Sequence, residues 1–533
     1  MSKNKITYEV SMEQLKKYAE ETDNDFFRKF DITNLRDPVF RRYLYKKIIM
    51  YLIFLVFVVL FMLLLSASTS PLYKDFCDGD SSIFMLIGKG INSGKELYKD
   101  YFDHKGPLLF YLNALGLKLT GTKSGVFIIQ CIFLWVTSIF MYKTARIFTK
   151  TTRAVICTLI SVAAFGATIS DGNFSEDYCM LFCMVPIYLS VRYFAKAPDM
   201  PHPFRYMYIY GICFAFCAFT RINNGLIICG IVLTAVVTDF INDHIKESLK
   251  NIMYFLLGIL TVTVPICLFF IAKGTFSDMI FSTFTFNFMY ASNGSDSKTA
   301  SDIADMIMWI LPIITMIVVS SIFAKRLGPR VASLISTMSV FALIPIILGF
   351  GYTHYYTTLI PLIPIYTAMF FFLAGNRINF PAIMLCVIMV FTMYNYISGV
   401  SYNTAHYLQK LYKQQKPNEY SDVYSDIYYS AKSLSSYIPE EERDSVFGYN
   451  VSSAWFLTAD IMPCYRLFTL QESWATNYPE FGRAINEMMI ETPPKWVIIH
   501  NIDIIQSRQL LNIIKDNYTL VSEFEYDMLY KHN

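Results

Sequence analysis

Residues Ile48–Leu65 read IIMYLIFLVFVVLFMLLL. The run carries no charge and comes close to the roughly 20 apolar residues that a membrane-crossing helix needs. A mostly polar segment, 1–46, precedes it, whereas a cleavable signal sequence has its apolar part near the start. We therefore predict a retained first span after a cytoplasmic extension that is helical at most around Ser11–Glu21. Four basic residues stand just before the run and place the N-terminus in the cytoplasm: Arg41, Arg42, Lys46 and Lys47.

The composition of the whole chain indicates a protein with many such spans. Of 533 residues, 54% are hydrophobic and 16% are charged, against about 25% charged in soluble domains. A net charge of +3 is too balanced to indicate a nucleic-acid partner. Ten further apolar blocks predict spans near 124–142, 154–169, 178–195, 206–220, 225–241, 251–271, 305–323, 331–349, 357–374 and 380–398. Together with the first, they predict about 11 transmembrane helices and a C-terminus outside the cell.

The distribution of basic residues among the loops supports this topology. Thirteen Lys and Arg residues, among them Arg377, fall in the predicted cytoplasmic connections, against Arg221, Lys273 and Lys298 in the short outer ones. If the 14-residue apolar segment Pro107–Thr120 crossed the membrane, every later loop would lie on the opposite side of it. We therefore expect it to lie along the outer membrane surface as an interfacial helix, inside one long outer loop, 68–123.

Three regions follow from these patterns: a cytoplasmic extension (1–46), a membrane domain (47–398) and a polar, Tyr-rich segment (399–533). The last region alternates short strand-like runs with helix-like stretches, which predicts a small extracytoplasmic α/β domain. The expected strands are Ser445–Tyr449, Trp496–His500 and Tyr518–Phe524, and the expected helices are Glu480–Ile490 and Ser507–Asp516. The chain is thus predicted to be a multi-pass protein of the cell membrane.

Cysteine usage gives no sign of a metal centre. Nine of the eleven cysteines lie in apolar blocks without zinc-finger spacing, where they serve as small packing residues. The other two, Cys77 and Cys464, both fall outside the membrane in the predicted topology. That placement leaves open a disulfide between them.

Ionisable residues beside a membrane are costly, and they mark candidate functional sites. Here they gather in four segments on the predicted outer side: the first loop, the SDGNFSEDY connection (170–178), the end of the fifth span at Arg221, and GYTHYYTT (351–358). Carboxylates can accept a proton from a hydroxyl, and cationic side chains can hold a departing phosphate. This combination suits group transfer from a membrane-bound phosphate donor.

Each segment also has a simpler interpretation. Asp78-Gly79-Asp80 resembles a solvated turn, and Lys105-Gly106-Pro107 resembles a loop-to-helix corner. Glu176 stands where a helix cap would stand, Arg221 could extend to the lipid headgroups, and His354 could be an interface histidine. The convergence of the segments on one side, and their order along the chain, favour the functional interpretation.

That ordered set resembles the C-type glycosyltransferases (GT-C), which use polyprenyl-phosphate sugars. The resemblance is greatest to bacterial relatives of protein O-mannosyltransferases and to lipid A aminoarabinose transferases. The family has an acidic pair after the first span and then a Gly…Tyr-x-Asp-x-x-Asp-x-Lys-x-Pro run. In this chain the run consists of Gly94, Tyr98, Asp100, Asp103, Lys105 and Pro107. Many members have Asp-Glu as the acidic pair, whereas this chain has Asp78 and Asp80 separated by a glycine.

The later motifs of the family are shorter. Glu176 matches a second acidic position, Arg221 and Asn223 match an Arg-x-Asn pair, and His354 and Tyr355 match a basic-aromatic pair before a Pro-rich span. The resemblance covers about 45–400 and, more loosely, the C-terminal region.

The resemblance implies a role for each matched residue. Asp80 would be the base for the acceptor hydroxyl, and Glu176 would position the acceptor or assist the sugar. Lys105, Arg221 and His354 would contact the donor phosphate, while Asp103 and Tyr98 would hold the first loop in shape. The full set expected to bind substrate is Asp78, Tyr98, Asp100, Asp103, Lys105, Arg221, Asn223, His354 and Tyr355.

The predicted activity is transfer of a sugar from polyprenyl phosphate to an extracytoplasmic hydroxyl, with inversion. The acceptor could be a glycan, a lipid or a protein. No cofactor or metal is expected, although some related enzymes with an Asp-x-Asp motif bind a divalent ion. A transporter or lipid-linked glycan flippase is the alternative, but such proteins usually show internal repeats and binding residues at the membrane midplane. A simple membrane anchor would not need eleven spans.

Overall fold

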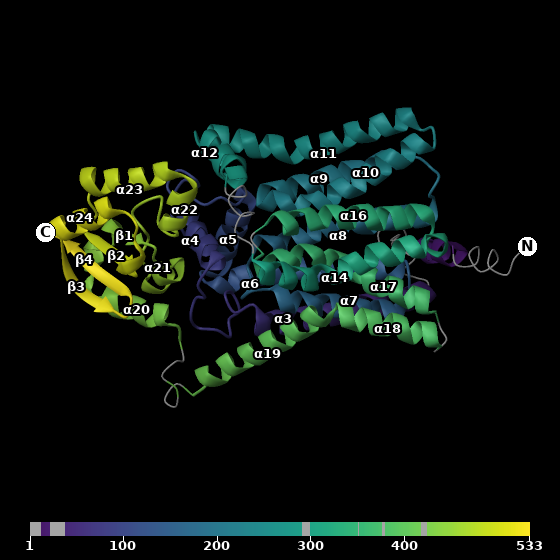
Figure 1. Ribbon diagram of the computed structural model, residues 1–533, viewed down its shortest axis with the longest axis horizontal. Coiled ribbons are helices and arrows are strands. Elements are labelled where there is room, and N and C mark those ends of the chain that lie inside the picture. The colour runs from purple at the N-terminus through teal and green to yellow at the C-terminus, as the bar shows by residue number, and fades with distance from the viewer. Residues whose placement is uncertain are drawn as a thin grey trace, which may run out of the picture.

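The structure is a computed structural model, and it describes residues 12–21, 38–289, 299–349, 351–375, 379–416, 420 and 424–533. A long bundle of helices carries a small domain at one end (Figure 1). The spanning helices are α3 (Pro38–Leu65), α6 (Lys123–Arg146), α7 (Thr151–Thr168), α8 (Ser175–Lys196), α9 (Phe204–Arg221), α10 (Leu226–Ile241), α11 (Ile245–Ala272), α14 (Ala300–Ile322), α16 (Pro329–Leu348), η4 with α17 (Thr353–Leu362 and Ile363–Ala374), α18 (Phe380–Thr392) and α19 (Tyr394–Gln414).

Nine helices among the described residues are long and apolar enough to cross a membrane, or ten if α18 and α19, bent by 53°, form one span. One of the nine, Phe204–Ile241, has 38 residues, far more than the roughly 20 that a bilayer requires. It doubles back at the 3₁₀ turn Ile222–Gly225. The amide N–H of His202, just before α9, donates to Asp239 near the end of α10 (3.1 Å). With α9 and α10 counted as separate spans, the helices match the predicted number of about eleven.

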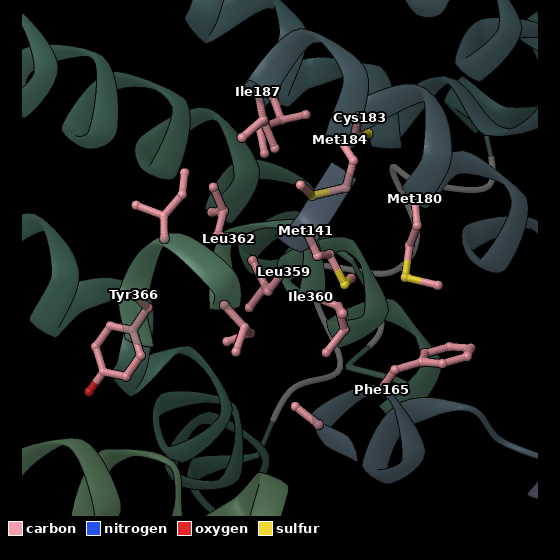
Figure 2. Packing of buried hydrophobic residues seen from close by; sticks show 14 of the residues in the cluster. Met141, Phe165, Met180, Cys183, Met184, Ile187, Leu359, Ile360, Leu362 and Tyr366 are labelled. Carbon is pink, nitrogen blue, oxygen red and sulfur yellow. The ribbon is translucent and has the colours of Figure 1, made fainter. Parts of the chain in front are cut away.

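The core of the bundle is formed by the middle spans. Figure 2 shows Met180, Met184 and Ile187 of α8 facing Leu359 and Leu362 of η4 in this buried cluster. The span that contains η4 and α17 is the most deeply buried of the nine, because other helices surround it.

Helix α11 lies at the edge of the bundle and packs against α9. Gly211 and Gly258 lie where the two backbones meet, and a Cβ on either glycine would fall about 2 Å from a carbonyl oxygen of the other helix. Small residues of this kind allow helices to approach closely within a membrane.

The loop end of the bundle, which carries residues 66–122, contains two short helices. They are α4 (Asp80–Asn92) and α5 (Pro107–Thr120). Helix α5 has the bounds expected of the interfacial segment, begins with proline at its first position and ends at Gly121 in a left-handed conformation. No span lies between α3 and α6, so α4 and α5 belong to one long connection.

The opposite end of the bundle carries the basic connections. Arg153 donates to the carbonyl of Gly375 (2.8 Å), and Arg330 donates to Asn242 (2.8 Å). Residues 12–21 are helical and pack here, with Glu21 paired to Arg146. The rest of the expected N-terminal extension up to residue 37 lies outside the described residues, as do Lys298 and Arg377 of the charge pattern.

The predicted boundary at Ser398 falls inside helix α19, which runs on to Gln414, so the polar C-terminal region begins within this helix. It then folds as a four-stranded sheet with helices, in the order β1-β2-β4-β3. Strands β1 (Val446–Tyr449), β2 (Trp496–His500) and β3 (Tyr518–Phe524) lie where the sequence predicts them, whereas β4 (Asp527–His532) was not predicted. Strand β2 is parallel to β1 and antiparallel to β4. The helices of the domain are α20 (Asp426–Leu434), α21 (Ser453–Ala459), α22 (Gln471–Asn477), α23 (Pro479–Glu491) and α24 (Arg508–Asn517).

Aromatic side chains join this domain to the first loop. The ring of Phe102 lies 5.0 Å from Trp474, 4.7 Å from Phe481 and 5.2 Å from Phe286, centroid to centroid. Phe286 follows the short helix α12 (Phe276–Ile280) and a π-helical turn, Phe281–Thr285. The backbone N–H of Phe102 also donates to the carbonyl of Arg466 (3.0 Å). The first loop, the 281–286 segment and the C-terminal domain therefore share one core.

Candidate active site

The first loop is fixed against the end of α9 by a close backbone contact. The N–H of Gly106 donates to the carbonyl of Thr220 (3.0 Å). A Cβ at residue 106 would lie 2.1 Å from the carbonyl oxygen of Phe219, so only glycine fits there. Pro107 then starts α5. The Lys-Gly-Pro segment thus holds Lys105 beside Arg221.

Three residues of the first loop form an ion cluster around Lys105. Its Nζ lies 3.7 Å from Oδ2 of Asp80, the first residue of α4. Its backbone N–H donates to Oδ1 of Asp103 (2.9 Å). Burial, together with the charge of Asp80, raises the pKa of the Asp103 carboxyl to about 6, although Lys105 opposes the shift.

Glu176 forms a second cluster at the start of α8. Its Oε1 atom pairs directly with the guanidinium of Arg221 and lies 3.9 Å from Nε2 of His354. Its Oε2 atom accepts a hydrogen bond from Ser175 Oγ (2.7 Å). The Arg221 guanidinium lies over the ring of Tyr355, 4.1 Å from the centroid. A fully buried carboxylate thus fixes two basic side chains from other segments.

The two clusters are close enough to interact electrostatically. Burial on its own would raise the pKa of the Asp80 carboxyl. The charges of Lys105 and Arg221 outweigh burial and hold that pKa below its usual value. Asp80 is therefore ionised at neutral pH, and the four predicted segments meet at one place.

A cavity of about 260 Å³ opens beside these clusters. Its lining includes the polar side chains of His104, Lys105, Arg221, Asn223 and Asn287 and the apolar side chains of Leu226, Phe284, Phe288, Ile344, Pro345 and Leu348. Burial and the nearby charges of Lys105 and Arg221 hold the pKa of His104 well below its usual value, so this ring is neutral. The lining thus offers cationic groups to an anion and apolar side chains to a hydrocarbon chain.

Three residues expected to bind substrate lie elsewhere. Asp78 accepts hydrogen bonds from its neighbour Gly79 and from Ser452 of the C-terminal domain (2.5 Å). Asp100 accepts from the N–H of Glu96 (2.7 Å) and closes a turn. The hydroxyl of buried Tyr98 donates to the carbonyl of Lys105 (2.7 Å), so it holds the shape of the loop.

Two residues of the site were not assigned to it from the sequence. His104 lies 3.0 Å from Lys105 Nζ through its Nε2 atom. Asn287 donates from Nδ2 to the carbonyl of His104 (2.5 Å). Asn287 is the one amide in the aromatic run FSTFTFNF, residues 281–288, and this contrast was the available signal.

Neither a disulfide nor a metal cluster accompanies the site. Cys77 and Cys464 are both free thiols. Among the described residues, no group of three or more His, Cys, Asp or Glu side chains is placed to hold a metal ion.

Solved structures with the same fold are membrane glycosyltransferases. ArnT from Cupriavidus metallidurans bound to undecaprenyl phosphate aligns with a TM-score of 0.56 at 11% identity, over 90% of this chain and 97% of ArnT. The apo form of ArnT aligns over the same shares at 11% identity, with a TM-score of 0.53. The archaeal oligosaccharyltransferase AglB from Archaeoglobus fulgidus, in complex with an inhibitory peptide and dolichol-phosphate, has 13% identity, a TM-score of 0.48 and coverage of 84% and 69%. The chain has the GT-C fold and is a multi-pass membrane protein.

Sequence comparison adds a family. No curated protein matches the chain. The family described as the putative competence-induced protein Ccs4 N-terminal domain matches residues 44–382. The match includes the first loop, Glu176, Arg221 and His354, and it ends before the C-terminal domain. Since it covers more than half of the 533 residues, the chain belongs to the family of the Ccs4 N-terminal domain.

Proposed function

We propose that this protein transfers a sugar from a polyprenyl-phosphate donor to a hydroxyl group of an extracytoplasmic acceptor. The observation that carries the proposal is a cavity lined by both cationic and apolar side chains, one of which, Lys105, lies 3.7 Å from ionised Asp80. The resemblance of the fold to ArnT, solved with undecaprenyl phosphate, is consistent with a donor of this class.

The donor phosphate fits against Lys105 and Arg221, and its prenyl chain fits along Leu226, Phe284 and Pro345. Arginine and lysine stabilise the charge that develops on a departing phosphate, above all in a site that excludes water. Asn287 holds the carbonyl of His104 and thereby fixes the Lys105 segment.

Asp80 is the proposed base. When Lys105 turns to the phosphate, its positive charge is shared with the phosphate and stabilises the Asp80 carboxylate less. The pKa of Asp80 then rises, and this carboxylate becomes a better proton acceptor. Asp80 takes the proton of the acceptor hydroxyl, the hydroxyl oxygen bonds to the anomeric carbon, and the bond from that carbon to the phosphate oxygen breaks. The electron pair stays on the phosphate. Attack opposite the leaving group inverts the anomeric centre.

Glu176 has a different role in this proposal from the one expected. Its two oxygens are engaged by Ser175, Arg221 and His354. We therefore assign it to positioning these two basic side chains rather than to contact with the sugar or the acceptor. No step requires a cofactor or a metal ion, and unchanged transfer after treatment with EDTA would support this part.

The membrane orientation is part of the proposal. The loop end and the C-terminal domain lie outside the cell, and the basic end lies in the cytoplasm, in agreement with the positive-inside rule.

The test compares wild type, Asp80→Asn and a control, Asp278→Asn on α12, in membranes. Lipid-linked sugars and envelope acceptors are analysed together by mass spectrometry. Asp80→Asn is expected to lower transfer at least 100-fold, in the range seen for loss of a general base, while the donor accumulates and the control transfers normally. Full transfer by a folded Asp80→Asn variant would refute the role of Asp80. If wild type acts on no lipid-linked sugar but moves one across vesicles, the protein is a flippase.

A further inference from the structure

A polar surface of the C-terminal domain faces the first loop next to the active site. Ser452 follows β1, and His500 ends β2, the strand parallel to it. The carboxyl ends of parallel strands are where ligands commonly bind in α/β sheets. Ser452 Oγ donates to Oδ1 of Asp78 (2.5 Å), two residues before the proposed base. This end of the sheet is therefore adjacent to the place where an acceptor must arrive.

His500 is held in one orientation by a chain of buried hydrogen bonds. Its Nδ1 atom lies 2.7 Å from Oδ1 of Asp527, and Oδ2 of Asp527 accepts from Ser430 Oγ (2.5 Å). The indole N–H of Trp455 donates to the same Ser430 hydroxyl (3.1 Å). The His500 side chain is 46% exposed, whereas that of Asp527 is 10% exposed. Because Nδ1 is occupied, the other ring nitrogen of His500 is left for a ligand.

An exposed aromatic ring lies beside His500. Tyr526 stands in the turn between β3 and β4, after Glu525 at a φ of 51°, and it is 65% exposed. Its ring centroid is 6.5 Å from that of His500. The hydrogen bond to Asp527 raises the pKa of His500 against the effect of burial, and the charge of Asp78 adds to the rise. Asp78 is tied to this end of the sheet by Ser452, which follows β1, the strand paired with β2.

These groups suit a polyhydroxylated ring. The apolar face of a sugar packs on an exposed aromatic ring, while its hydroxyls bind an imidazole and a carboxylate. A peptide would find no free sheet edge at β2, which is paired on both sides.

We infer that Tyr526, His500 and Asp78 form the acceptor subsite of the enzyme and that the acceptor is a glycan. This inference rests on the proposed function. Asp78 and Asp80 then face different neighbours across Gly79: Asp78 faces Ser452 at the acceptor subsite, and Asp80, the proposed base, faces Lys105 between that subsite and the donor site.

The test uses the full-length protein in lipid nanodiscs, fluorescently labelled and applied to a printed array of bacterial surface oligosaccharides. Tyr526→Ala and His500→Gln are expected to weaken binding to the glycans that wild type binds at least 10-fold. Both variants should keep the wild-type affinity for undecaprenyl phosphate and the wild-type melting temperature.

Two matched exchanges serve as controls. Tyr402→Ala removes another exposed tyrosine, on α19, and His532→Gln changes a histidine of β4 that packs on Tyr518. Both should bind glycans as wild type does. The inference is overturned if wild type binds no glycan on the array, if it binds only a peptide array used alongside, or if the two subsite variants bind like the controls. Normal transfer by Asp80→Asn, with glycan binding still lost in the subsite variants, would refute the proposed base and leave the subsite standing.

Discussion

The Nζ atom of Lys105 lies 3.7 Å from Oδ2 of Asp80, although Asp80 begins α4 and Lys105 lies just before α5. Lys105 is the largest of the charges that lower the pKa of Asp80. The same ammonium group lines the cavity proposed for the donor phosphate. In the proposed mechanism, one lysine thus connects the ionisation of Asp80 to occupation of the donor site.

Lys105→Gln should therefore change the pH dependence of transfer as well as its rate. Without the lysine charge, burial raises the pKa of Asp80, so the base becomes protonated at a higher pH. The acid limb of kcat/KM is expected to move to higher pH, and donor KM is expected to rise at least 10-fold. A pH–rate profile from pH 4 to pH 9 checks both. An unchanged acid limb would show that Asp80 does not control it.

Arg221→Leu should destabilise the fold as well as stop the reaction, because it leaves buried Glu176 without its cation. Removing one partner of a buried ion pair costs about 3–5 kcal/mol. The double variant Arg221→Leu with Glu176→Gln should recover most of this loss in equilibrium unfolding in mixed micelles, yet remain inactive. If the double variant is as unstable as the single one, the pair is not the cause.

Asp103 should give the fold a pH dependence of its own. Its pKa is raised from 3.8 to about 6 in the folded protein, so the folded state holds a proton that the unfolded chain has lost. The stability that this proton contributes is complete below pH 3.8 and is lost as the pH rises through about 6. Asp103→Asn is expected to show a flatter melting temperature across this window. Equal slopes for the variant and wild type would mean that folded Asp103 is already ionised there.

Gly106→Ala should detach the Lys105 segment from α9. The added methyl group would lie 2.1 Å from the carbonyl oxygen of Phe219, and backbone on both sides has little room to move. Binding of undecaprenyl phosphate is expected to fall at least 10-fold. Gly482→Ala is the control, because its Cβ meets only Ala475 at an ordinary 3.5 Å. Normal binding by Gly106→Ala would show that the contact does not position the site.

The sequence predicted the helices well, because hydrophobicity and length determine a membrane span almost alone. It also predicted α5, whose proline and glycine mark both ends. It missed β4, since Asp527–His532 mixes charged and apolar residues and becomes a strand only by pairing between β2 and β3. The local sequence pattern carries no information about this pairing, which depends on the tertiary structure.

For the site, the sequence indicated which segments meet but not which atoms do. Motif order suggested that Glu176, Arg221 and His354 share one surface. The pairing of Arg221 with Glu176 depends on how α8, α9 and η4 pack, which spacing does not reveal. Asp78 was grouped with Asp80 because of its position, yet Gly79, at a φ of 96°, lets the two carboxylates face different neighbours.

The aromatic contacts of Phe102 limit how this protein could be altered. Trp474 and Phe481 belong to the C-terminal domain, while Phe102 belongs to the first loop and Phe286 follows the turn Phe281–Thr285. The Ccs4 family match stops at residue 382, but the packing continues across that limit. A chimera that receives another protein's C-terminal domain would have to receive the matching first loop and 281–286 segment as well. These stretches are distant in sequence, but they have to be exchanged together because they pack against one another.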